Sequence, residues 1–93
     1  MENKNVTLKN GQNTNYFELI TACLNGQAAK GISIGQMRDV IKVIDLFDNF
    51  KLATSILLTP SQLAIVQKSV EEMQWGIIDP ALVEMYDYIL SLK

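Results

Sequence analysis

The sequence predicts a compact, mostly α-helical domain built from four helices. Apolar residues make up 48% of the 93 residues and charged residues 19%, a balance that favours a buried core over disorder. Helix-capping side chains precede apolar residues at helical spacing near Asn15, Ser33, Thr59 and Asp79. We therefore expect a single helical domain over residues 15–93, with roughly 55–65% helix in the chain.

The N-terminal segment, residues 1–14, is polar and rich in asparagine. The short alternation over residues 6–8 and the turn signal at residues 10–11 are typical of a strand that ends in a turn. A pairing of residues 6–9 with residues 55–58 would form a small two-stranded sheet. The alternative for this segment is a loose terminal arm.

The first helix is expected to begin at Asn15. Asn15 and Glu18 have the spacing of a capping box, in which each side chain binds a backbone N–H of the other residue. We expect the helix to end at Gly26, because glycine favours the left-handed conformation that often closes a helix.

The second helix has the clearest start, because Ser33 and Gln36 also have capping-box spacing. Apolar side chains then follow on two adjoining faces: Met37, Val40, Ile41, Ile44 and Phe47 on one, and Val43, Leu46 and Phe50 on the other. A helix that is apolar over more than half of its circumference is usually packed by several neighbours. We therefore expect this helix to be the central one.

The third and fourth helices should form an antiparallel hairpin. Thr59 and Gln62 predict the start of the third helix, with Pro60 in its first turn, and Gly76 predicts its end. Asp79 then caps the fourth helix. Ile78 and Val83 are spaced to pack across that cap as a hydrophobic staple. Because the connection between the third and fourth helices is short, these two helices should lie side by side.

The sequence lacks the residues that most enzyme and metal sites require. It contains no histidine, and its single cysteine, Cys23, is expected to be a small buried side chain. Asp45 and Asp48 could share a divalent cation, but no further oxygen ligands accompany them, so solvated helix positions are the simpler interpretation. We expect no catalytic residue, no cofactor and no metal, and hence no enzyme.

Basic side chains on the second helix are candidates for a binding site. Arg38 is the only arginine, and with Lys42 it could bind a phosphate or a carboxylate. The alternative is a structural ion pair between Arg38 and Glu84 or Asp87 of the last helix.

Two aromatic side chains complete the set of candidate binding residues. Trp75 could fill the gap between the last two helices or be an exposed interface anchor. Tyr86 falls on the buried side of the last helix, which leaves Tyr88 as the more exposed aromatic ring.

Charge and hydropathy narrow the range of partners. The net charge is −2 and no basic stripe is present, so nucleic acid is not the expected partner. No apolar run is long enough to span a bilayer and no signal peptide is recognisable, so we expect a cytoplasmic protein. The apolar content favours self-association.

Several segments follow one another in a recognisable order: Tyr16-Phe17-Glu18-Leu19-Ile20, Cys23-Leu24, Gly31-Ile32-Ser33, Met37-Arg38, Val43-Ile44-Asp45 and Gln74-Trp75-Gly76. In this order, over roughly residues 6–90, the chain resembles small helical proteins encoded by tailed bacteriophages. The resemblance implies a phage or prophage origin, and a place in the host cytoplasm or the virion. It implies no particular activity.

Three functional hypotheses follow. The first is an accessory phage protein that works by protein–protein contact, as a homo-oligomer that also binds a phage or host protein, in virion assembly or in inhibition of host defence. The second is an oligomer that binds a nucleotide signal at its subunit junctions, through Arg38, Lys42 and a stacking Tyr88. The third is a DNA-associated regulator, which the low basic charge disfavours.

Overall fold

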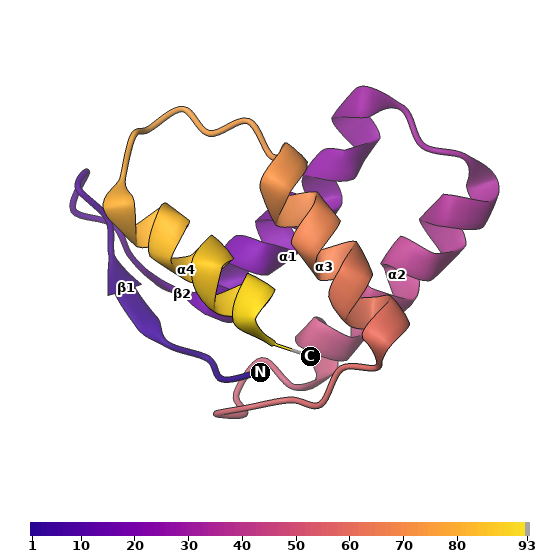
Figure 1. Ribbon diagram of the computed structural model, residues 1–93, viewed down its shortest axis with the longest axis horizontal. Coiled ribbons are helices and arrows are strands. Elements are labelled where there is room, and N and C mark those ends of the chain that lie inside the picture. The colour runs from indigo at the N-terminus through magenta and orange to yellow at the C-terminus, as the bar shows by residue number, and fades with distance from the viewer. Residues whose placement is uncertain (93) are drawn as a thin grey trace.

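The computed structural model describes residues 1–92, in which a short β-hairpin precedes four α-helices (Figure 1). The elements are β1 (Asn5–Thr7), β2 (Asn13–Asn15), α1 (Tyr16–Gly26), the 3-10 helix η1 (Gln27–Lys30), α2 (Ile34–Asn49), α3 (Pro60–Glu72) and α4 (Pro80–Ser91). Helical residues make up 61% of the described chain. The expected fold class, a mostly helical four-helix domain with a small two-stranded sheet, is confirmed.

The central helix is α1, so the expectation that α2 would be central is wrong. α1 contacts β2, α2 and α3, and it buries six side chains: Tyr16, Phe17, Leu19, Ile20, Cys23 and Leu24. In α2 only Val43 and Phe47 are buried. α1 and α3 cover one side of α2, and nothing in residues 1–92 covers the other side, which is therefore exposed despite its apolar character.

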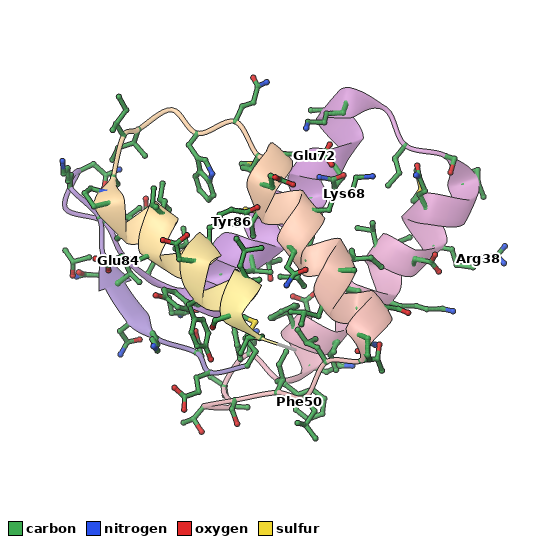
Figure 2. All side chains as sticks on the ribbon, viewed as in Figure 1. Arg38, Phe50, Lys68, Glu72, Glu84 and Tyr86 are labelled. Carbon is green, nitrogen blue, oxygen red and sulfur yellow. The ribbon has the colours of Figure 1, made fainter. Side chains whose placement is uncertain are left out.

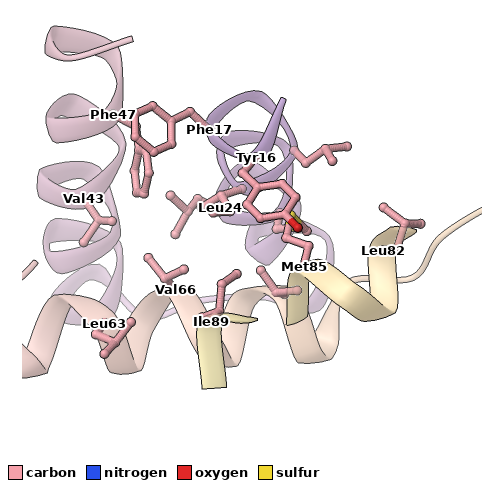
Figure 3. Close-up of a cluster of buried hydrophobic side chains, with 14 of the residues drawn as sticks. Tyr16, Phe17, Leu24, Val43, Phe47, Leu63, Val66, Leu82, Met85 and Ile89 are labelled. Atoms are coloured by element: carbon pink, nitrogen blue, oxygen red, sulfur yellow. The ribbon is translucent and has the colours of Figure 1, made fainter. Parts of the chain in front are cut away.

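The core lies where α1, α2, α3 and α4 meet (Figure 3). The rings of Phe17 and Phe47 meet edge to face with centroids 5.2 Å apart, which joins α1 to α2. α3 and α4 run in opposite directions as expected (Figure 1). The side-chain amide of Gln67 donates a hydrogen bond to the carbonyl of Ile89 at 3.1 Å, linking these two helices.

The N-terminal hairpin, residues 1–15, contains the small sheet. β1 pairs with β2 in antiparallel register, with Val6 opposite Thr14. The expected pairing of residues 6–9 with residues 55–58 is therefore wrong. Gly11, at φ +87°, lies in the five-residue loop between β1 and β2, so β2 pairs with β1 across a far shorter loop than residues 55–58 would require.

Residues near position 55 still contact the N-terminal hairpin, but further toward its start. Glu2 and Ser55 form an isolated antiparallel bridge. The N–H of Asn3 donates to the carbonyl of Thr54, and the N–H of Ile56 donates to the carbonyl of Met1, both at 2.9 Å. The N-terminal hairpin is thus attached to the α2–α3 connection.

Two helix ends differ from expectation because the glycines have other roles. α1 does end at Gly26, but the chain continues directly into η1, and the left-handed residue is Gly31 at φ +81°. Gly26 instead gives room to Met73, since a Cβ at position 26 would lie 2.8 Å from the Met73 sulfur. α3 ends at Glu72, before Gly76, because Met73 adopts an extended conformation.

Candidate functional site

The four sequence-predicted binding residues do not form one site within a chain. Arg38 and Lys42 are exposed on α2, Trp75 lies in the α3–α4 connection and Tyr88 lies on α4. α3 lies between α2 and α4 (Figure 1). The predicted residues therefore divide into three separate locations.

Arg38 has no structural ion pair with the last helix. It projects outward from α2, whereas Glu84 lies at the other end of the molecule (Figure 2). Within residues 1–92 the salt bridges all involve Glu72, whose carboxylate is 2.9 Å from the Lys30 Nζ and 3.8 Å from the Lys68 Nζ. The expected pairing of Arg38 with Glu84 or Asp87 is wrong, because α2 and α4 face different parts of the surface.

Tyr88 is occupied by contacts inside the molecule. Its hydroxyl accepts a hydrogen bond from the N–H of Glu2 at 2.9 Å, and the Nζ of Lys4 lies 4.4 Å from its ring centroid. The Tyr16 ring lies beside it, with centroids 5.8 Å apart. The half-buried Tyr88 ring thus holds the N-terminal hairpin, so the expectation of an exposed ring that stacks on a ligand does not fit a single chain.

Trp75 combines the two roles that the sequence left open. Its side chain is half-buried and packs against the core, and it also lines a shallow apolar groove at the start of α4. Ile78 and Val83, which were expected to pack across the helix cap, line the same groove but are 92% and 61% exposed. The α3–α4 connection therefore presents an apolar surface of its own.

The solvent-facing side of α2 is the most regular candidate site. Ile34, Met37 and Ile41 are 72%, 37% and 48% exposed and share one face of the helix. With Arg38 and Lys42 they line a shallow hollow. Such a surface can bury aliphatic side chains and place positive charges at the edge of a contact. Sequence reasoning included Met37 and Ile41 in the core, and it passed over Ile34 because that residue precedes the apolar stripe.

A second hollow lies between η1, α2 and α3, and its charges are already balanced. It is lined by Lys30, Lys68, Glu72 and Asp39 among other residues. The hydrogen bond from Lys30 is the main reason why the pKa of Glu72 is lowered. Because both lysines contact this carboxylate, the hollow has no excess of positive charge for an anion.

Reactive groups are few in the described part of the chain. Cys23 is fully buried, and burial raises the pKa of its thiol to about 12, so at neutral pH it is protonated and shielded from reagents. Residues 1–92 contain no group of three or more histidine, cysteine, aspartate or glutamate side chains placed to hold a metal ion. Asp45 and Asp48 are exposed on α2.

No helix in residues 1–92 is both long enough and apolar enough to cross a bilayer. Comparison of the chain with models of protein families, with curated proteins and with solved structures gave no match.

Proposed function

We propose that this protein works by protein–protein contact and that its first partner is a second copy of itself. The observation that carries the proposal is the row of three exposed aliphatic side chains, Ile34, Met37 and Ile41, on one face of α2. Single exposed apolar residues are common on protein surfaces, but a contiguous apolar patch is typical of an interaction site.

The α2 face is not needed to complete the fold. The core is closed by α1, α3, α4 and the buried side of α2. In residues 1–92, every buried side-chain nitrogen or oxygen has a hydrogen-bond partner. A helix of 16 residues with three exposed aliphatic side chains on one face therefore has surface available for a partner.

The resemblance to phage proteins suggests the setting. An accessory protein of this kind would act in virion assembly or on a host defence protein, and the apolar groove around Trp75 and Val83 offers a second surface for such a partner. A pull-down from infected cells is the way to identify that protein. The nucleotide-binding hypothesis would require a junction between chains to bring Tyr88 to Arg38.

Self-association is tested by light scattering after size exclusion, at micromolar concentration and over a hundredfold dilution. We expect at least a dimer for the wild-type protein. Ile41→Glu should give a monomer, because it places a charge in the apolar contact. Leu57→Glu is the matched control, because Leu57 is 94% exposed in the α2–α3 connection, outside the α2 face.

Circular dichroism of both variants checks that the helices are retained. A wild-type protein that stays monomeric over the whole dilution range would contradict the proposal. An oligomer that persists in Ile41→Glu would show that another surface is used.

A further inference from the structure

We infer that two copies pair through α2 in antiparallel orientation, with the twofold axis near Ile41 and Arg38 opposite the partner's Asp45. This inference rests on the proposed self-association and adds the orientation, the register and a specific charged contact. Its basis is the distribution of charge along the exposed side of α2.

The two halves of α2 carry opposite charges on their exposed side. Arg38 lies in the N-terminal half, Lys42 lies at the middle of the helix, and Asp45 and Asp48 lie in the C-terminal half. All four side chains are exposed, and none belongs to a salt bridge formed within residues 1–92. Asp39 interrupts the pattern in sequence but lines the hollow beside α3. The face is therefore self-complementary when one copy is reversed.

Helical geometry places these charges beside the exposed aliphatic side chains. At 3.6 residues per turn, Ile34, Arg38, Ile41, Asp45 and Asp48 fall within a narrow sector of the helix. This sector lies opposite the side that buries Val43 and Phe47. A partner helix laid along it would contact aliphatic and charged groups together.

Like-charge contacts exclude the parallel orientation. In a parallel pair each Arg38 would meet the partner's Arg38, and each Asp45 the partner's Asp45, which costs free energy at an interface. In an antiparallel pair the basic part of one helix meets the acidic part of the other. A twofold axis makes every such contact twice.

The same reasoning selects the register. An axis between Met37 and Arg38 would give the greatest apolar overlap, but it would bring the two Arg38 side chains together. Moving the axis by about one turn centres the pair on Ile41 and places Arg38 opposite the partner's Asp45. The two Lys42 side chains then lie near the axis, but at the edge of the contact, where solvent screens their charges. Ile34 then lies near the partner's Asp48.

The surface around Asp48 can receive an aliphatic side chain. Asp48 borders a hollow whose lining residues are mostly polar but include Leu52, which is 93% exposed. Ile34 is 72% exposed and is the most prominent apolar side chain of the α2 face. The selected register therefore places Ile34 at a hollow where Leu52 offers an aliphatic contact, and it gives Arg38 a carboxylate.

Cysteine cross-linking measures the register directly, because the buried Cys23 does not compete for mild oxidants. We expect Ile41→Cys to form a disulfide-linked dimer. Ile34→Cys alone should not, since in this register the two copies of position 34 are about 20 Å apart. A mixture of Ile34→Cys and Asp48→Cys should give a mixed dimer. Leu57→Cys is the background control.

Charge exchange tests the Arg38 contact. Arg38→Asp and Asp45→Arg should each weaken dimerisation by at least about tenfold, because each places like charges together twice. The double variant should restore the wild-type dissociation constant. Sedimentation velocity measures all three, with melting temperature as the check on folding.

The outcomes separate this inference from the proposal beneath it. If the wild-type protein dimerises but position 34 cross-links to itself as readily as position 41, the helices are parallel and the inference is wrong while the self-association stands. If the double variant fails to recover affinity, the Arg38 contact is wrong. If the wild-type protein is a monomer, both proposals fail.

Discussion

At the scale of single residues, Asp79 joins the N-terminal hairpin directly to the start of α4. It is only 7% exposed. Its carboxylate caps α4 by accepting the N–H of Ala81 at 3.0 Å, and it accepts the N–H of Lys9 at 2.7 Å. These two bonds, that of Ala81 first, lower the pKa of Asp79.

The lowered pKa gives Asp79 a pH-dependent contribution to stability. Because the pKa is lower in the folded state than in the unfolded chain, where it is about 3.9, the contribution is present above roughly pH 4 and is lost as pH falls through the folded-state value. Asp79→Asn keeps an oxygen acceptor but removes the charge. It should lower the melting temperature by several degrees at pH 7 and by clearly less near pH 3.

Differential scanning calorimetry at the two pH values makes this comparison. Asp87→Asn is the control, because Asp87 is an exposed carboxylate on the same helix. A melting-temperature difference that is the same at both pH values would show that the carboxylate charge of Asp79 contributes nothing.

The candidate residues show where sequence reasoning is limited at this scale. The capping role of Asp79 was predictable, because its partner Ala81 is two residues away. The contact between Tyr88 and Glu2 was not, because 86 positions separate them. Residue type and spacing alone therefore could not show that the Tyr88 ring is already occupied.

At the scale of elements, helix starts were predicted better than helix ends. Ser33 with Gln36 and Thr59 with Gln62 form the reciprocal capping boxes that their spacing predicts, since both bonds are local. At Asn15 only half of the box forms: Asn15 accepts the N–H of Glu18, but the Glu18 carboxylate accepts the Thr14 hydroxyl. The reason is that residue 15 is also the last residue of β2.

Helix ends depend on packing as well as on local bonds. Gly26 and Gly76 are placed where a glycine commonly ends a helix, but neither has a positive φ; the glycine with a positive φ in this region is Gly31. The contact that explains Gly26 comes from Met73, in another part of the chain. A glycine that is needed for its conformation therefore cannot be distinguished in the sequence from one that is needed for its small size.

Gly31 and Gly35, which are four positions apart, allow a matched test of this point. Gly31→Ala should destabilise the protein by about 1–2 kcal/mol, because an L-residue at φ +81° is strained. Gly35→Ala should stabilise it by up to about 1 kcal/mol, because Gly35 lies in α2 with open space around its Cα. Urea unfolding followed by circular dichroism measures both. Equal stabilities for the two variants would contradict the assignment of roles.

At the scale of the whole molecule, the fold class and the helix-rich content were predictable, but the layering was not. Periodicity shows which face of a helix is apolar and leaves open whether a neighbour covers that face. Ile34, Met37 and Ile41 are therefore on the surface, although the apolar positions of α2 cover more than half of its circumference. The candidate interface could not be predicted for the same reason, because the sequence does not show which helices pack against α2 and which of its faces they leave exposed.

The attachment of the N-terminal hairpin has a consequence for the order of folding. Its contacts with Asp79 and Tyr88 close loops of 70 and 86 positions. Closing such long loops costs conformational entropy, and packing compensates this cost only after α1 and α4 have assembled. These contacts should therefore be absent from the rate-limiting transition state. Changes that weaken them should then accelerate unfolding while leaving the refolding rate almost unchanged, which makes the hairpin a determinant of how long the native state persists.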